Sequence, residues 1–176
     1  RLVGQKLSED HYSPQNFDDA FSKKVFKKYL TQIDPDKTFF LQSDIDQLKQ
    51  KYENHIDDEI KGAPVEFFLE AGKIFNTRME ENAKICAGIL SKPFDFNVDE
   101  DVNLDGDKIN YTTTDAERQE RWRKKLKYLA LERYSDLLDM REKNKGKEGF
   151  EVKTDAQLEQ EARDKVKKLM DRTFDR

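Results

Sequence analysis

Cysteine, glycine, proline and long apolar runs are all scarce in this sequence. With one cysteine, Cys86, no disulfide can form within the chain, and cysteine usage leaves the compartment open. No apolar run approaches the roughly 18 residues that a membrane span requires, and Arg1–Asp10 lacks the apolar centre of a signal peptide. Seven glycines and four prolines are few for a sheet-rich protein with many tight turns. These shortages favour an all-α fold.

Charged residues, in contrast, make up 40% of the 176 residues, and the mean hydropathy is -1.01. The 33 Lys and Arg nearly balance the 37 Asp and Glu, and the net charge of -4 argues against a basic nucleic-acid-binding domain. Leu, Ile, Val and Phe still form about a quarter of the chain, enough for a folded core. We expect one domain over residues 1–176, an all-α bundle or array of about five to seven helices with long loops.

The first long helix is expected to begin at Asn16, a good N-cap residue, with Asp18 and Asp19 in its first turn. Asp34 and Pro35 are expected to end it, because the residue before a proline is pushed out of helical geometry. Its apolar positions recur every four residues, with Phe26 and Leu30 beside them, which predicts an amphipathic helix: Phe17, Phe21, Val25, Tyr29 and Ile33.

Two further helices follow in the predicted order. Ser43 is expected to cap one continuous helix that ends near Lys61 and Gly62, with apolar positions at Ile45, Leu48, Tyr52, Ile56 and Ile60. Pro64 fits the first position of a third helix, which we expect to form the centre of the core. Its predicted stripe is Phe68, Gly72, Phe75, Met79, Ala83, Cys86 and Leu90, and a second apolar edge is formed by Phe67, Ile74, Ile85 and Ile89.

A polar, acidic connection over residues 94–114 is too long for a tight turn, and loops of that length deserve functional scrutiny. A fourth helix is expected from about Thr114 to Arg141. The pair Thr154 and Gln157 matches the capping box of a last helix.

Part of the long loop matches the start of a calcium-binding pattern, in which oxygen donors alternate around a glycine turn. The match then fails, because Lys108 and Thr112 stand where an apolar residue and a bidentate glutamate are needed. We therefore interpret the loop as an acidic turn and predict no metal site and no cofactor. The candidate ligands set aside are Asp101, Asn103, Asp105 and Asp107.

No catalytic residue can be assigned. Cys86 lies on the apolar stripe, which favours a buried thiol over a nucleophile, and His11 and His55 show neither metal spacing nor a link to it. Acidic residues are too numerous to single out a general acid–base pair. The chain has no Gly-rich phosphate loop, no GxSxG elbow and no HExxH motif.

A basic cluster surrounds Trp122 and raises the question of nucleic-acid binding. Glu117 and Glu120 interrupt it, and the chain as a whole is acidic. We favour a tryptophan core anchor with charged flanks and predict no nucleic-acid partner. The cluster comprises Arg118, Arg121, Arg123, Lys124, Lys125 and Lys127.

Several residues, taken in order and spacing, resemble the N-terminal domain of tail-specific proteases, also called C-terminal processing peptidases. The clearest stretch, residues 10–46, carries His11, Tyr12, Phe17, Ala20, Phe21, Ser22, Phe26, Tyr29, Leu30, Asp34, Leu41, Ser43 and Asp44. Later stretches add Lys92, Pro93, Asp95 and Phe96, then Asn103 to Asp105, and then Trp122, Lys125 and Lys127.

This resemblance implies the non-catalytic N-terminal part of a larger serine endopeptidase of the bacterial envelope. In that family a helical region precedes a PDZ domain and a Ser-Lys catalytic domain, neither of which this chain matches. The implied partners are those domains, protein substrates entered from the C-terminus and an envelope adaptor protein. A periplasmic location, with an export signal or lipid anchor upstream of Arg1, is implied in the same way. The missing initiating Met is expected of an excised fragment.

Two alternatives stay open from the residues alone. One is a freestanding helical adaptor or scaffold that binds a protein partner. The other, a minor one, is a calcium-responsive module that uses the acidic loop.

Overall fold

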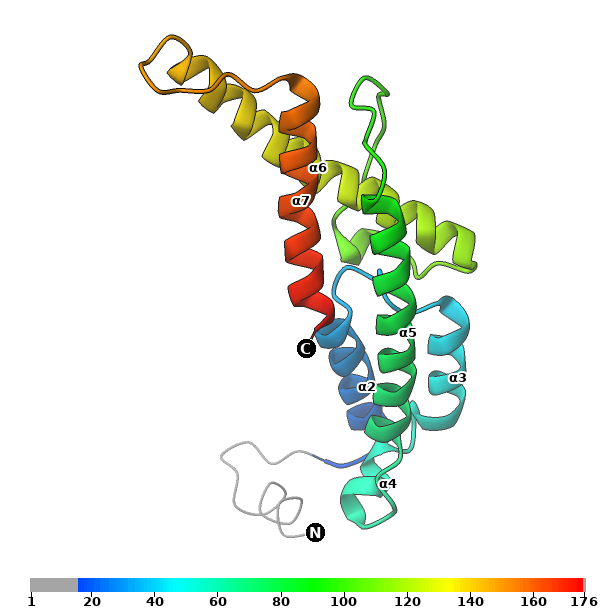
Figure 1. Cartoon of the computed structure of the whole chain (residues 1–176). Helices are drawn as coiled ribbons and strands as arrows, with labels where there is room; N and C mark the ends of the chain where they lie inside the picture. The colour runs from blue at the N-terminus through cyan, green and yellow to red at the C-terminus, as the bar shows by residue number, and fades with distance from the viewer. Residues whose placement is uncertain (1–15, 176) are drawn as a thin grey trace. The chain divides into compact units, whose positions relative to one another are not determined.

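The computed structural model describes residues 16–175, and this part of the chain is all-α (Figure 1). The predicted fold class is therefore confirmed. The described residues contain six α-helices, one 3-10 turn and a single isolated parallel bridge, between Leu41 and Thr112. None of the described helices is long and apolar enough to cross a membrane. The elements are α2 (Asp19–Ile33), α3 (Gln42–Tyr52), α4 (Ile56–Lys61), α5 (Phe67–Leu90), η1 (Gly106–Lys108), α6 (Asp115–Asn144) and α7 (Asp155–Phe174).

The described chain divides into two compact units. Unit 1 holds the residues up to Arg78 together with Asp105–Thr114, and unit 2 holds Met79–Leu104 and the residues from Asp115 onward. Helix α5 therefore contributes its first half to unit 1 and its second half to unit 2. The expectation of one domain over residues 1–176 stays a prediction.

Helix α2 begins two residues later than expected. Asp18, not Asn16, is its N-cap, since the Asp18 carboxylate accepts a hydrogen bond from the Phe21 amide at 2.9 Å. The buried face is also turned by one residue from the predicted stripe. Its centre is Ser22, Phe26 and Leu30, and the predicted Val25, Tyr29 and Ile33 are half-buried beside it.

The predicted second helix is two helices, α3 and α4. The chain turns at residues 53–55 and resumes at Ile56, which is buried. The Asp44 carboxylate, and not Ser43, caps α3 by accepting from the Leu41 amide at 2.9 Å. The predicted end is confirmed, because Gly62 has a φ of 125°, which favours glycine.

Helix α5 begins at Phe67 rather than at Pro64. Its first amides are satisfied from the preceding helix, since the Glu59 Oε1 atom accepts from the Glu66 amide at 3.0 Å and the Phe67 amide at 2.8 Å. The buried stripe is again turned by one residue as far as Asn82, with Phe67, Ala71 and Asn82 buried, and it coincides with the predicted stripe at Cys86 and Leu90.

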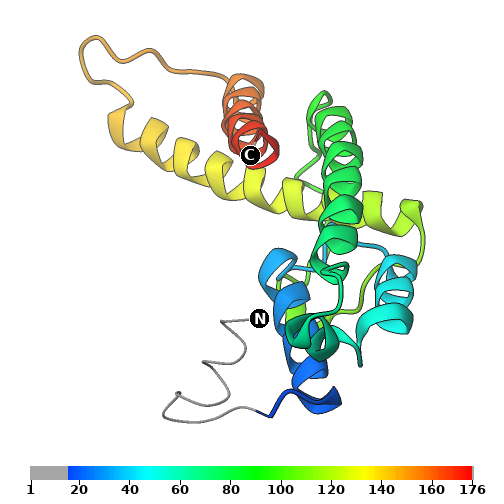
Figure 2. The same cartoon turned by 90° about the horizontal axis from the view of Figure 1, so that it is seen from below.

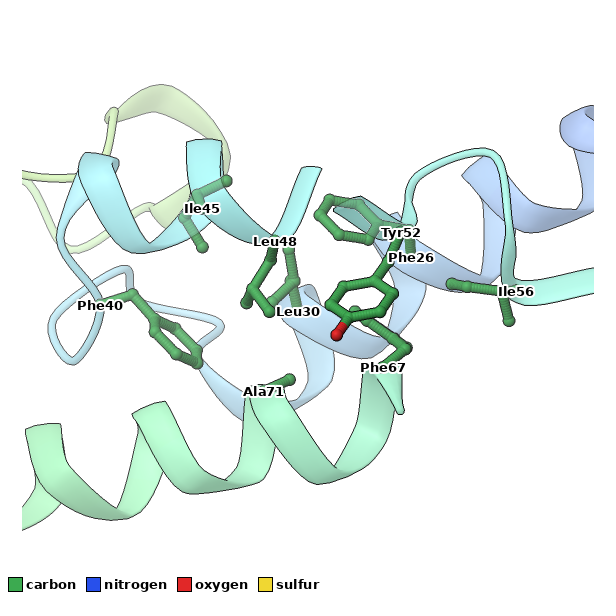
Figure 3. Packing of buried hydrophobic residues seen from close by; sticks show 9 residues of the cluster. All are labelled: Phe26, Leu30, Phe40, Ile45, Leu48, Tyr52, Ile56, Phe67 and Ala71. Carbon is green, nitrogen blue, oxygen red and sulfur yellow. The ribbon is translucent and has the colours of Figure 1, made fainter. Parts of the chain in front are cut away.

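The core of unit 1 is built around Phe67 (Figure 3). Its ring centroid lies 5.4 Å from that of Phe26, 5.3 Å from that of Tyr29 and 5.8 Å from that of Tyr52. Phe40, from the turn after α2, is fully buried in the same cluster. Four helices thus contribute to one aromatic-rich core, whose buried members are Phe26, Leu30, Phe40, Ile45, Leu48, Tyr52, Ile56, Phe67 and Ala71.

The segment Asp105–Thr114 returns to complete unit 1. The Thr112 carbonyl accepts from the Gln42 amide at 2.8 Å, and the Ile109 carbonyl accepts from Lys37 Nζ at 2.6 Å. The ring of Tyr111 packs edge-on against Phe40. Residues more than sixty positions apart in the sequence are therefore neighbours in this unit.

Unit 2 is organised by α6 and α7, which a long connection joins (Figures 1 and 2). Leu137 of α6 packs against Leu158 and Ala162 of α7. The predicted capping box is confirmed: the Gln157 side chain accepts from the Thr154 amide at 2.9 Å, and Thr154 Oγ1 accepts from the Gln157 amide at 3.3 Å.

Candidate functional site

The calcium-like loop is held by contacts within the protein. Asp105 accepts from the Asp107 amide at 3.1 Å and forms an ion pair with Lys108 Nζ at 2.9 Å, so it caps the 3-10 turn η1. Over residues 16–175, no three His, Cys, Asp or Glu side chains gather in a way that could hold a metal ion. The arrangement is that of an acidic turn.

Cys86 and His55 lie in opposite environments. Cys86 is buried, and this burial raises the pKa of its thiol to about 12, which keeps it protonated near neutral pH. His55 is exposed, with Nδ1 3.4 Å from an Asp58 carboxylate oxygen. His11 and Tyr12 lie outside the described residues. A protonated, buried thiol is a packing group rather than a nucleophile.

The residues around Trp122 form a structural network. The Trp122 indole is buried and donates to Asn82 Oδ1 of α5 at 2.9 Å. Arg118 is also buried and forms ion pairs with Glu81 at 2.7 Å and Asp115 at 2.8 Å. Lys125 lies over the indole ring, 5.3 Å from its centroid. Much of the positive charge in the predicted basic cluster is therefore used inside unit 2.

A concave surface of unit 2 lies along the loop of residues 91–104. One groove, of about 640 Å³, lies between this loop, the end of α5 and the first half of α6. A second, of about 730 Å³, lies between the loop, α6 and the start of α7. Lys92, Pro93, Asp95 and Phe96, which carry the family resemblance, all belong to this loop. Pro93, Phe94 and Asp95 line both grooves.

A cluster of three charged residues, Glu100, Arg123 and Lys127, fixes the loop to α6. The Glu100 carboxylate accepts from the guanidinium of Arg123 and from Lys127 Nζ, the latter at 2.5 Å. Lys127 Nζ also donates to the Val98 carbonyl at 3.0 Å. Hydrogen bonds from Arg123, then from Lys127, lower the pKa of Glu100 to about 2. We call these residues the Glu100 cluster.

The start of the loop is fixed to α7. The Phe94 amide donates to Glu159 Oε1 at 3.0 Å, and Glu159 forms an ion pair with Arg163 at 3.0 Å. Arg163 in turn donates to the Leu90 carbonyl at 2.9 Å and so satisfies the last turn of α5. Because both parts of the loop are fixed, it presents the groove walls as a formed surface.

Between these two attachments the loop combines apolar and aromatic side chains. Phe96 stacks on Tyr134 of α6, with ring centroids 5.1 Å apart and planes 26° apart. Val98, at the edge of the first groove, is 52% exposed. The loop therefore offers apolar surface beside charged groups, a combination typical of sites that contact polypeptides.

Replacing Glu100 with Gln tests this attachment through pH. The folded-state pKa of Glu100 lies below its ordinary value of 4.5, so its stabilisation is present above pH 4.5 and is lost as the pH falls toward 2. We expect Glu100→Gln to lower the urea midpoint at neutral pH and to flatten the acid-induced loss of stability in that window. Urea unfolding at a series of pH values measures both effects.

The matched control is Glu148→Gln, which removes the same charge from an exposed position in the link between α6 and α7. This variant should follow the wild-type profile. A Glu100→Gln chain with an unchanged acid profile would show that the Glu100 cluster does not hold the loop.

The sequence singled out part of this loop and placed Arg123 and Lys127 in the basic cluster, but it did not indicate that these two residues fix the loop through Glu100. Glu100 was one of 37 acidic residues with no feature to separate it. The available signal was on α6, where Arg123 and Lys127 are four residues apart and therefore lie on the same face. Such a pair predicts an acidic partner, but not which one.

Comparison with known proteins identifies a family and a curated relative. The family model described as the tail specific protease N-terminal domain matches residues 3–176. The tail-specific protease of Haemophilus influenzae is 27% identical to this chain over 140 residues. That alignment covers 80% of this chain and 19% of the relative, so the chain spans about one fifth of the length of that relative.

Proposed function

This chain belongs to the tail-specific protease N-terminal domain family, and we propose that it is the non-catalytic helical part of a longer serine endopeptidase. In this proposal the chain helps to shape the substrate chamber and docks partner proteins. The serine and lysine of catalysis and the PDZ domain lie elsewhere in the full-length protein, and the cell envelope is its compartment.

The observation that carries the proposal is the family match over residues 3–176. The chemistry of the described side chains is consistent with a non-catalytic role. Ser22 Oγ is buried and donates to the Asp57 carboxylate at 2.7 Å, and Asp57 also accepts from Lys61 Nζ at 2.6 Å. A buried hydroxyl that donates to a carboxylate connects two helices and is not available to a substrate. Cys86 is protonated and buried, as described above.

The groove between the 91–104 loop and α6 is our candidate for the substrate-facing surface. An extended polypeptide needs apolar contacts and nearby polar groups along a preformed wall. The loop provides both, and its attachments at Glu100 and Glu159 limit the entropy lost when a polypeptide binds.

Photo-crosslinking in the full-length protease tests this proposal. A photoreactive residue at Val98, with the catalytic serine replaced by alanine, is expected to crosslink to an unstructured substrate polypeptide. The matched control is Val152, which has the same exposure of 52% but lies in the link before α7. We expect a substrate adduct at position 98 and background at position 152.

Two results would contradict the proposal. Equal crosslinking at both positions, or none at 98, would remove the groove as a substrate-facing wall. Turnover of the same polypeptide by the purified 176-residue chain alone, insensitive to serine-protease inhibitors, would contradict the non-catalytic role.

A further inference from the structure

Helix α2 carries a basic face that the proposed function does not use. Lys23, Lys24, Lys27 and Lys28 are all exposed, and we call them the lysine face. Successive residues turn by about 100° around a helix axis, so these side chains lie opposite the buried Ser22, Phe26 and Leu30. Ala20 and Thr31 share this side of the helix, and the one acidic residue of α2, Asp19, is exposed at its edge, one turn before Lys23. In Figure 2, α2 (blue) lies at the edge of unit 1.

The charges of the lysine face are not balanced within the described part of the chain. None of its four ammonium groups forms an ion pair with another residue of 16–175. The spacing places Lys23 beside Lys27 and Lys24 beside Lys28, and like charges four residues apart destabilise a helix. Helix α6 differs, because Arg118 and Arg123 are each paired with acidic residues. The lysine face is therefore a locally positive surface on a chain with a net charge of -4, and it can attract a negatively charged partner.

We propose that the lysine face of α2 is an electrostatic docking surface for negatively charged lipid headgroups at a membrane surface. Clusters of four or more basic residues on an amphipathic helix are suited to such surfaces. The contact is peripheral, by the side of the helix.

The make-up of this face favours a lipid surface over a nucleic acid or an acidic polypeptide. Single strands are bound by aromatic side chains interleaved with basic ones, and the aromatic residues Phe26 and Tyr29 of α2 lie on the inward side. A specific polypeptide site needs a pocket for an apolar anchor, and none of the four lysines lines any of the grooves described above. Each lysine carries a point charge on a flexible side chain, and the four lie along the exposed side of one helix. They can therefore interact with a layer of mobile anionic headgroups without a fixed geometry.

Each lysine near an anionic membrane strengthens partitioning roughly fivefold. Two removed charges should therefore weaken binding about 25-fold. The attraction acts within a Debye length of about 8 Å at physiological salt, so the local face can outweigh the repulsion of the acidic remainder.

Vesicle co-sedimentation of the 176-residue chain tests the proposal. We expect binding to vesicles of phosphatidylcholine with about one third phosphatidylglycerol, no binding to pure phosphatidylcholine, and release at high salt. The double variant Lys24→Gln with Lys28→Gln should lose most of this binding. Its thermal midpoint should be unchanged or slightly higher, because one like-charge pair is removed.

The matched control is Lys167→Gln with Lys168→Gln, which removes the same charge from exposed positions of α7. This control should bind the anionic vesicles like the wild type. Equal loss in both double variants would mean that net charge, and not the lysine face, governs binding, and would overturn the proposal. Failure to bind anionic vesicles even at low salt would also overturn it, as would binding of poly-glutamate or a nucleic acid in place of the vesicles.

Discussion

Replacing Gly106 with alanine is expected to destabilise the chain by about 3 kcal/mol or more. A Cβ atom at this position would lie 1.8 Å from the Pro35 carbonyl oxygen and 2.9 Å from the Pro35 carbonyl carbon. Both atoms belong to the backbone, so no side-chain rotation can relieve the overlap. The turn after α2 and the returning segment Asp105–Thr114 would have to move apart.

Urea unfolding measures this loss, with Gly72→Ala as the matched control. Gly72 lies inside α5, and a Cβ there would meet nothing within 4 Å. Alanine in a helix interior is favoured over glycine, so this variant should gain up to about 1 kcal/mol. If Gly106→Ala unfolds at the wild-type midpoint, the close contact between the returning segment and Pro35 is wrong.

The second large effect is expected at Asp34, where we predict that alanine destabilises the chain by about 4 kcal/mol. The buried Asp34 carboxylate accepts from three successive backbone amides: Thr38 at 2.8 Å, Phe39 at 3.1 Å and Phe40 at 3.0 Å. Without it, those N–H groups are left unsatisfied in or near the core. Phe40, fully buried in the unit 1 cluster, would then lose the turn that positions it.

Asp46→Ala separates this effect from a simple change in charge. Asp46 is exposed on α3, where its carboxylate accepts a hydrogen bond from the Gln42 side chain at 2.9 Å. Its loss should change stability by less than about 0.5 kcal/mol. Urea unfolding, with near-UV circular dichroism as a probe of the aromatic core, measures both variants. Similar losses in the two would contradict the role assigned to the Asp34 carboxylate.

Helix ends were predictable where the residue type itself favours a helix end, as a glycine with positive φ or a capping side chain does. Gly62 ends α4 in the left-handed region, and Thr154 with Gln157 begins α7. The turn at residues 53–55 was not predictable, because the apolar spacing of Tyr52, Ile56 and Ile60 continues through it as if the helix were unbroken. Apolar periodicity indicates which residues are buried, but it does not show whether they belong to one helix or to two consecutive helices with the same spacing.

The buried faces of α2 and α5 were displaced by one residue for a related reason. A prediction of the buried face from apolar residues alone omits polar ones, yet Ser22 and Asn82 are fully buried. Ser22 is satisfied by Asp57, and Asn82 accepts from the Trp122 indole. Such partners lie 35 and 40 residues away in the sequence, and one sequence contains no signal that pairs them.

The candidate site was predictable only as a region. The length of the connection over residues 94–114 and the resemblance at Lys92 to Phe96 pointed to it. The Glu100 cluster joins this loop to residues 23 and 27 positions later, a pairing that depends on how α6 lies in unit 2. Local spacing cannot specify contacts of that range.

The discontinuous make-up of unit 1 has a consequence for synthesis on the ribosome. Its core is completed only by Asp105–Thr114, and the bond from Lys37 to the Ile109 carbonyl closes a separation of 72 residues. Contacts of such long range form late, because the entropy of closing the loop is lost before the contact is gained. Helices α2 to α4 will therefore have left the ribosome well before unit 1 can close. During that interval Phe40 lacks its cover by Tyr111, and the nascent chain exposes an aromatic surface that a chaperone can bind.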